Sequence, residues 1–69
     1  MVTAPSRIPE LTRRELDVVE GIVHGYTNDE VAHSLRMSTN TVRSHLRTVY
    51  IKLGISNRIQ LANWYHEND

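Results

Sequence analysis

The chain has 69 residues, no cysteine and a formal net charge of zero. This length corresponds to one small domain, which buries only about 60% of the surface that its unfolded chain exposes. Without cysteine the chain has no disulfide framework and no thiolate metal site, which fits a reducing compartment. Apolar runs such as residues 49–51 are too short for a membrane span or a signal peptide, so we expect a cytoplasmic protein without membrane contact.

Residues 1–10 contain both prolines and show no periodic apolar pattern. Such a segment is typical of a flexible tail or of the remnant of a linker. The remaining residues, 11–67, divide into four helical segments separated by short turns, without repeats or low-complexity stretches. We therefore predict an all-α fold, a compact four-helix domain that contains a helix-turn-helix.

The first helix is predicted to begin after Thr12, which forms a capping box with Glu15. Apolar side chains then recur at helical spacing and form one stripe, which consists of Leu16, Val18, Val19, Ile22 and Val23. Gly25 suits the left-handed conformation in which many helices end. Gly21, inside the helix, costs about 1 kcal/mol relative to alanine, and it either permits close helix packing or is simply tolerated.

A second capping box, Thr27 with Glu30, opens a short second helix. Only Arg36 and Met37 separate that helix from Ser38, the expected N-cap of the third. Two capped helices joined by so short a turn must cross at a steep angle, which predicts a helix-turn-helix unit over about residues 28–47.

The third helix is predicted over residues 39–53 and the fourth over about residues 57–66, with Gly54 and Ser56 as the residues that end one and begin the other. At about 100° per residue, the third helix has two unlike faces. Its apolar seam consists of Val42, Leu46, Val49 and Leu53. The opposite, mainly polar face carries Asn40, Arg43, Ser44, Arg47, Thr48 and Ile51.

Cations are concentrated in the second half of the chain. Residues 1–30 hold three arginines and six carboxylates, whereas residues 31–69 hold five cations and two carboxylates, neither of them between Val31 and His66. Charge alone leaves two interpretations open, an electropositive binding surface and an ordinary solvated helix face. The first is favoured because a stabilising surface helix usually interleaves Glu with Lys or Arg. The carboxylates of the first half are expected to cap helices and to pair with Arg13 or Arg14.

The polar face of the third helix has the chemistry of a DNA-reading surface. Arginine binds guanine O6 and N7 with two parallel hydrogen bonds, and serine or threonine hydroxyls bind bases or phosphates. An α-helix also fits the major groove of double-stranded DNA. We therefore predict sequence-specific binding of double-stranded DNA, with residues 39–53 as the recognition helix. The alternative is a helical adaptor that binds an acidic protein partner.

Three segments resemble the LuxR-type helix-turn-helix domain, which is also the output domain of NarL/FixJ-type response regulators. They are "LTRRE" (residues 11–15), "GYTNDEVAHSLRMSTNTVRSHL" (residues 25–46) and "KLGISNR" (residues 52–58), and the resemblance covers about residues 11–65. Each segment alone is weak evidence, but three in this order and at this spacing are specific.

The resemblance implies base contacts in the major groove by Arg43, Ser44 and Arg47. It also implies a phosphate contact by Thr41 and further contacts with the DNA backbone by Asn28, Asn40, Lys52 and Asn57. Members of the family bind as dimers on two half-sites, so the resemblance implies a homodimer, and RNA polymerase is a further expected partner.

The fourth helix is the expected dimer contact. It carries Leu61, Trp64 and Tyr65 on one side and Ile59 on the other. If the first side covers the core, the dimer face comprises Ile59, Ala62, Asn63 and His66; the alternative is that all the apolar residues of this helix belong to the core. Departures from the family pattern are Gly21 in place of a large aliphatic residue, Ile51 at a position more often polar, and Tyr65 in place of a smaller residue.

No metal, cofactor or enzymatic activity is expected. The four histidines, His24, His33, His45 and His66, match no metal-ligand spacing. The chain has no glycine-rich phosphate loop and no recognisable pair of nucleophile and base. It also shows no receiver or ligand-binding domain, so we expect either a fragment of a longer regulator or a stand-alone one.

Overall fold

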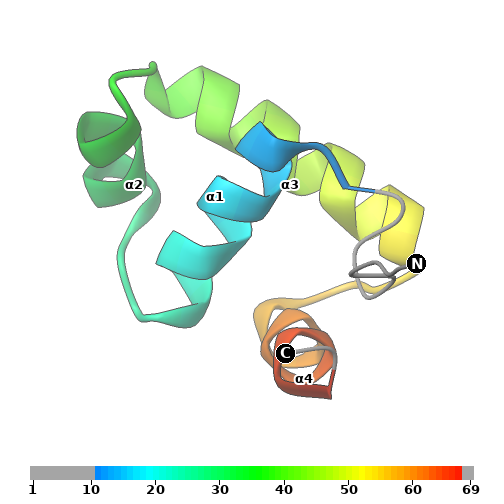
Figure 1. The fold of residues 1–69 in the computed structure, drawn as a ribbon. Coiled ribbons are helices and arrows are strands. Elements are labelled where there is room, and N and C mark those ends of the chain that lie inside the picture. Colours follow the sequence, from blue (N-terminus) through cyan, green and yellow to red (C-terminus); the bar gives the residue numbers. More distant parts are fainter. Residues whose placement is uncertain (1–10, 68–69) are drawn as a thin grey trace, which may run out of the picture.

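The computed structural model describes residues 11–67, which form four helices and no strand. The helices are α1 (Arg13–Val23), α2 (Asn28–Leu35), α3 (Thr39–Leu53) and α4 (Arg58–Glu67) (Figure 1). The predicted all-α, four-helix fold is therefore confirmed. The prediction of a tail or linker over residues 1–10 lies outside the described residues.

α1 is the common partner of the other helices. It packs against α2, α3 and α4, and α2 also packs against α3 to form the helix-turn-helix. The main helix contact of α4 is with α1, and Figure 1 shows α4 standing apart from α2 at the opposite side of the domain. The position of α4 relative to α3 is therefore set largely through α1.

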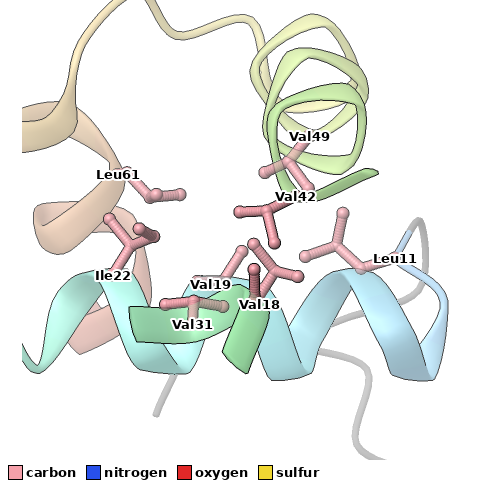
Figure 2. Close-up of a cluster of buried hydrophobic side chains, with 9 residues drawn as sticks. Leu11, Val18, Val19, Ile22, Val31, Val42, Val49 and Leu61 are labelled. Atoms are coloured by element: carbon pink, nitrogen blue, oxygen red, sulfur yellow. The ribbon is translucent and has the colours of Figure 1, made fainter. Parts of the chain in front are cut away.

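The core lies between α1 and the inward faces of the other helices. It consists of Leu11, Val18, Val19, Ile22, Val31, Ala32, Val42, Val49 and Leu61. Figure 2 shows Val42 and Val49 of α3 pointing toward α1, and Leu61 of α4 approaching Ile22. The predicted seam of α3 is confirmed, because Val42 and Val49 are fully buried and its two leucines pack against the core half-buried.

The predicted N-caps of the first three helices are confirmed. The hydroxyl oxygens of Thr12 and Thr27 each accept a hydrogen bond of 3.1 Å from the backbone N–H three residues later. In return, the carboxylates of Glu15 and Glu30 accept the backbone N–H of the capping threonine. Ser38 Oγ accepts the backbone N–H of Thr41 at 3.0 Å. Each side chain satisfies a donor that the helix itself leaves unpaired.

The predicted start of the fourth helix is wrong by one residue. The cap is Asn57 and not Ser56, because Asn57 Oδ1 accepts the backbone N–H of Gln60 at 2.9 Å. The Gln60 side chain in turn accepts the backbone N–H of Ser56. Asparagine caps as well as serine does, so sequence preference alone did not separate these neighbours. α4 accordingly runs over Arg58–Glu67.

Three helices end in the same backbone motif, a left-handed residue followed by a hydrogen bond back to the helix. The left-handed residues are Gly25, Arg36 and Gly54, with φ of 98°, 59° and 67°. The following residue donates its N–H to the carbonyl five positions earlier, as in the bond of 3.0 Å from Met37 to Ala32. This is the Schellman motif, in which glycine is the usual left-handed residue. Arg36 occupies that position at a steric cost.

Gly21 permits the close approach of α1 and α2. A Cβ atom added at Gly21 would lie 2.7 Å from Cγ2 of Val31. Val31 is only 2% exposed, so its side chain has little space into which to move. The missing side chain at position 21 is therefore used by the packing, and is not merely tolerated.

The left-handed residue of the helix-turn-helix turn gives a stability prediction. Arg36→Gly is expected to raise the free energy of unfolding by about 0.5–1 kcal/mol, because glycine adopts a positive φ without the clash of Cβ. Gly54→Ala, at nearly the same φ directly after α3, is the matched control and should lower it by about 1 kcal/mol. Urea denaturation of the three proteins measures both changes. A less stable Arg36→Gly variant would show that the arginine side chain outweighs the backbone cost.

Candidate nucleic-acid interface

The face of α3 opposite the core is open to solvent. Asn40, Arg43, Ser44 and Arg47 are all exposed, and together they line one shallow hollow of about 430 Å³. They come together because positions three and four apart along a helix share one face. The structure thus brings all three predicted base-contacting residues onto one surface, together with Asn40 from the predicted phosphate set.

The helix-turn-helix turn holds the N-terminal end of α3 against α2. The Thr39 hydroxyl donates a hydrogen bond of 2.7 Å to Oδ1 of Asp29 in the first turn of α2. Below this contact, Ala32 is buried and Met37 packs half-buried against the core. The exposed face of α3 is therefore presented on a fixed support. The Asp29–Thr39 bond had no sequence signal, since it joins two helices ten positions apart.

A second surface adjoins this face and is formed by residues of all four helices. It is a crevice of about 420 Å³ lined by Ile22, Asn28, Arg43, Leu46, Arg47, Tyr50 and Arg58. Its side chains include three arginines and no carboxylate among the described residues. Arg43 and Arg47 border both the crevice and the hollow on α3.

The two arginines of α3 have no charged partner among residues 11–67. Within residues 11–67 the salt bridges are those of Asp17 with Arg13 and Arg14, both at 3.4 Å, and that of Glu15 with Lys52 at 2.8 Å. The side chain of neither Arg43 nor Arg47 forms a salt bridge or hydrogen bond to any residue in that range. Their ten N–H donors in total are therefore available to a ligand.

The residues predicted to contact phosphate are not all on one surface. Asn28 lines the crevice beside the arginines, and Asn40 lies on the α3 face. The Thr41 hydroxyl is exposed but lies 2.9 Å from that of Ser38, and Asn57 caps α4 through its side chain.

Lys52 is engaged on another side of α3. Its Nζ donates a hydrogen bond of 2.8 Å to Oε1 of Glu15, whose side chain is only 8% exposed. The same carboxylate oxygen accepts the backbone N–H of Thr12 at 3.0 Å. Sequence reasoning assigned Glu15 to the capping box but missed its partner, because the two residues are 37 positions apart and no local pattern joins them.

The pKa of Glu15 is lowered from its ordinary value. Burial is the largest influence and acts in the opposite direction, but it is outweighed by the hydrogen bonds from Lys52 and Thr12 and by the charges of Lys52 and His45. The ionised carboxylate is therefore the stable form at neutral pH, and it links the start of α1 to the end of α3.

α4 has two distinct sides. Leu61 is fully buried, and Trp64 and Tyr65 are half-buried against the core. Ile59 on the other side is 73% exposed, so the alternative that every apolar residue of α4 belongs to the core does not hold. The residues predicted for dimer contact share this outer side; Ile59, Asn63 and His66 are exposed and Ala62 is half-buried.

Within residues 11–67 no three His, Cys, Asp or Glu side chains lie together so that they could hold a metal ion. No helix within this range is long and apolar enough to cross a membrane.

Comparison with known proteins shows to which family the chain belongs. A family model described as bacterial regulatory proteins, luxR family, matches residues 9–65, which is most of the chain. The chain belongs to the luxR family. This confirms the resemblance inferred from the three sequence segments. The luxR family is one of DNA-binding regulators and not of enzymes, in agreement with the prediction that the chain is not an enzyme.

Several regulators are similar to this luxR-family chain. It is 38% identical over 58 residues to the probable csgAB operon transcriptional regulatory protein of Salmonella typhimurium and to the CsgBAC operon transcriptional regulatory protein of Escherichia coli. These matches cover 84% of this chain and 27% of each relative. It is 40% identical over 52 residues to the HTH-type transcriptional regulator MalT of Yersinia pestis, which covers 75% of this chain and 6% of MalT. The chain thus spans 27% or less of the length of these relatives.

The contact between Glu15 and Lys52 predicts how stability depends on pH. Because the folded-state pKa of Glu15 is lowered, its contribution is complete above the ordinary glutamate pKa of about 4.3 and is lost as pH falls through the folded-state value. Glu15→Gln should therefore lower stability at pH 7, and it should reduce the loss of stability on acidification.

Glu30→Gln is the matched control for this prediction. Glu30 holds the same position in the capping box of α2 but is exposed and has no lysine partner among the described residues. Urea denaturation of both variants between about pH 7 and pH 3 measures the effect. Equal pH dependence in the two variants would show that Lys52 adds nothing to the capping box.

Proposed function

We propose that this chain binds double-stranded DNA sequence-specifically as the DNA-binding part of a transcriptional regulator, with α3 in the major groove. The observation that carries the proposal is the pair Arg43 and Arg47, which lie exposed on one face of α3 without an ionic partner within residues 11–67. Base edges in the major groove carry hydrogen-bond acceptors for guanidinium groups. Residues 11–67 provide no such acceptor to the side chain of Arg43 or Arg47.

Arg43, Ser44 and Arg47 are the proposed base contacts. Their common hollow is open, so a base edge reaches them without any rearrangement of the core. The two arginines lie one helical turn apart, which suits contact with neighbouring base pairs. Ser44 has a short side chain between them and allows the backbone of α3 to approach the bases closely.

The proposed contacts with phosphates are Asn28, Asn40, Thr41, Lys52 and Asn57. The crevice that Asn28 lines together with Arg43 and Arg47 supports a path for the DNA backbone beside α3. Lys52 differs from the others because one of its N–H donors is occupied by Glu15, which leaves two for a phosphate.

We further propose a homodimer on two half-sites, formed through Ile59, Ala62, Asn63 and His66 of α4. A hollow of about 270 Å³ beside Ile59 is lined by Ile22, Val23, Gly25, Arg58, Ile59 and Ala62. In a two-fold interface the same patch faces itself, so an exposed isoleucine next to an apolar hollow is self-complementary. As in a response regulator, such a dimer would act in the cytoplasm together with RNA polymerase.

Selection from random duplexes tests the proposal and identifies the site. This 69-residue chain is expected to enrich one motif with two half-sites, whereas Arg43→Ala/Arg47→Ala should enrich none. If neither protein binds DNA at low salt while both are folded, the cationic face of α3 binds a protein, and the adaptor interpretation replaces this one.

Single substitutions separate base contacts from phosphate contacts. On the selected site, Arg47→Ala is expected to cost about 1–3 kcal/mol of binding free energy and to relax specificity at one base pair. Arg13→Ala is the control, because Arg13 is an exposed cation on α1 that pairs with Asp17, and it should leave binding unchanged. Fluorescence anisotropy on the site and its single-base variants measures both. An equal loss on every sequence would make Arg47 a phosphate contact.

Lys52→Ala is expected to weaken binding by a similar factor on all sequences and to lower the salt slope of the binding constant by about one. Glu15→Gln provides the comparison, because it frees the ammonium without removing it. Titrations at several salt concentrations give the slope. An unchanged slope in Lys52→Ala would assign the lysine to Glu15 alone.

A further inference from the structure

α4 is attached to the domain along one line of side chains. Arg58, Leu61 and Tyr65 follow one another at spacings of three and four residues, which places them on one side of the helix. Leu61 is fully buried, and the other two make polar contacts with α1 and the loop that follows it. Since α1 is the main helix contact of α4, this line decides the direction in which α4 points.

Arg58 forms the most specific of these contacts. Its Nη2 donates hydrogen bonds to the backbone oxygens of Ile22, at 3.1 Å, and Tyr26, at 3.2 Å. One carbonyl lies in the last turn of α1 and the other in the loop to α2, so a single nitrogen joins α4 to both. The last turn of α1 has no basic residue of its own, and the guanidinium supplies the positive charge that a helix C-terminus favours.

The other end of α4 also contacts α1. The Tyr65 hydroxyl donates to Oε2 of Glu20 at 3.4 Å, and the Tyr65 ring meets the His24 ring edge-on with centroids 6.4 Å apart. The start of α4 is thus joined to main-chain atoms of α1 and the following loop, and its end contacts side chains of α1 and that loop.

Arg58 also lies between the two surfaces that the proposed function uses. It lines the crevice that contains Arg43 and Arg47, and it lines the hollow beside Ile59. A change in its bonds would rotate the outer side of α4 relative to α3 without altering the surface of either helix. In a dimer formed through α4, such a rotation changes the distance and angle between the two recognition helices.

We propose that Arg58 is a positioning residue that sets the spacing between the two half-sites this protein accepts. The inference rests on the proposed dimeric DNA binding and deepens it, by naming the residue that converts the dimer contact into a preference for one DNA spacing. Arg58 acts through main-chain carbonyls and not by contact with a base.

The probe is a set of duplexes that carry two inverted copies of the half-site selected as described above, separated by zero to about ten base pairs, one helical turn. A duplex with one half-site is the reference. Affinities of the wild-type chain, Arg58→Met and Arg58→Lys are measured on each duplex. Methionine keeps the apolar stem without the donors, and lysine keeps the charge without the planar fork.

Wild type is expected to prefer one spacing. Both Arg58 variants should bind the single half-site as wild type does, but their preference among spacings should fall by about threefold to tenfold, the size expected for weakening one or two hydrogen bonds. Ile59→Asp is the control for the contact itself and should reduce binding at every spacing to the level of one half-site.

Each other outcome overturns the inference in a recognisable way. An unchanged spacing preference in both variants removes the positioning role, and an equal loss on the single half-site makes Arg58 a direct DNA contact. If wild type gains nothing from a second half-site, the dimer is wrong while DNA binding stands; if it binds no duplex, DNA binding itself is wrong.

Thermal melts show whether the Arg58 variants are folded. If they are unfolded, Tyr65→Phe, which loosens the other end of α4, is measured on the same duplexes. An unchanged spacing preference then overturns the inference.

Discussion

Burial of one face of α1 is the constraint on which the rest of the domain depends. Val18 and Val19 are fully buried, and α2, α3 and α4 all pack against this helix. Each fully buried aliphatic side chain stabilises the fold by about 1.5–3 kcal/mol. A chain of 69 residues can bury few side chains, so those of α1 carry much of the stability. A short helix at the centre therefore serves as the reference to which the functional helices are fixed.

Polar contacts at the two ends of α1 add direction to this apolar packing. Near its start, Glu15 binds Lys52 at the end of α3; at its last turn, Ile22 accepts from Arg58 at the start of α4. Apolar contacts tolerate sliding and rotation, whereas hydrogen bonds to single atoms do not. The helix that would read DNA and the helix that would join two copies are thus oriented from opposite ends of one element.

Carboxylates and arginines are used in different ways in this domain. Carboxylates of α1 and α2 are used within the domain, as helix caps and as partners of Arg13, Arg14 and Lys52. The exposed face of α3 retains its arginines without such partners among residues 11–67. A net charge of zero together with a local positive face favours short-range recognition over long-range attraction, because non-specific affinity for DNA grows with the number of phosphates neutralised.

The sequence by itself determined the helices, their caps and the face of α3. Capping boxes and seams join residues three to seven positions apart, and at that range helix geometry alone decides which side chains meet, so Thr12 with Glu15 and Val42 with Val49 were predictable. Even there, the choice between Ser56 and Asn57 was not, because both residues cap equally well. Only the tertiary structure decided which residues far apart in the chain come into contact: Asp29 with Thr39, Glu15 with Lys52, and Arg58 with the carbonyls of Ile22 and Tyr26. These contacts depend on how the helices cross. The crossing is set by side-chain volumes where helices touch, such as the absence of a Cβ at Gly21 beside Val31, and no local pattern in the sequence records it.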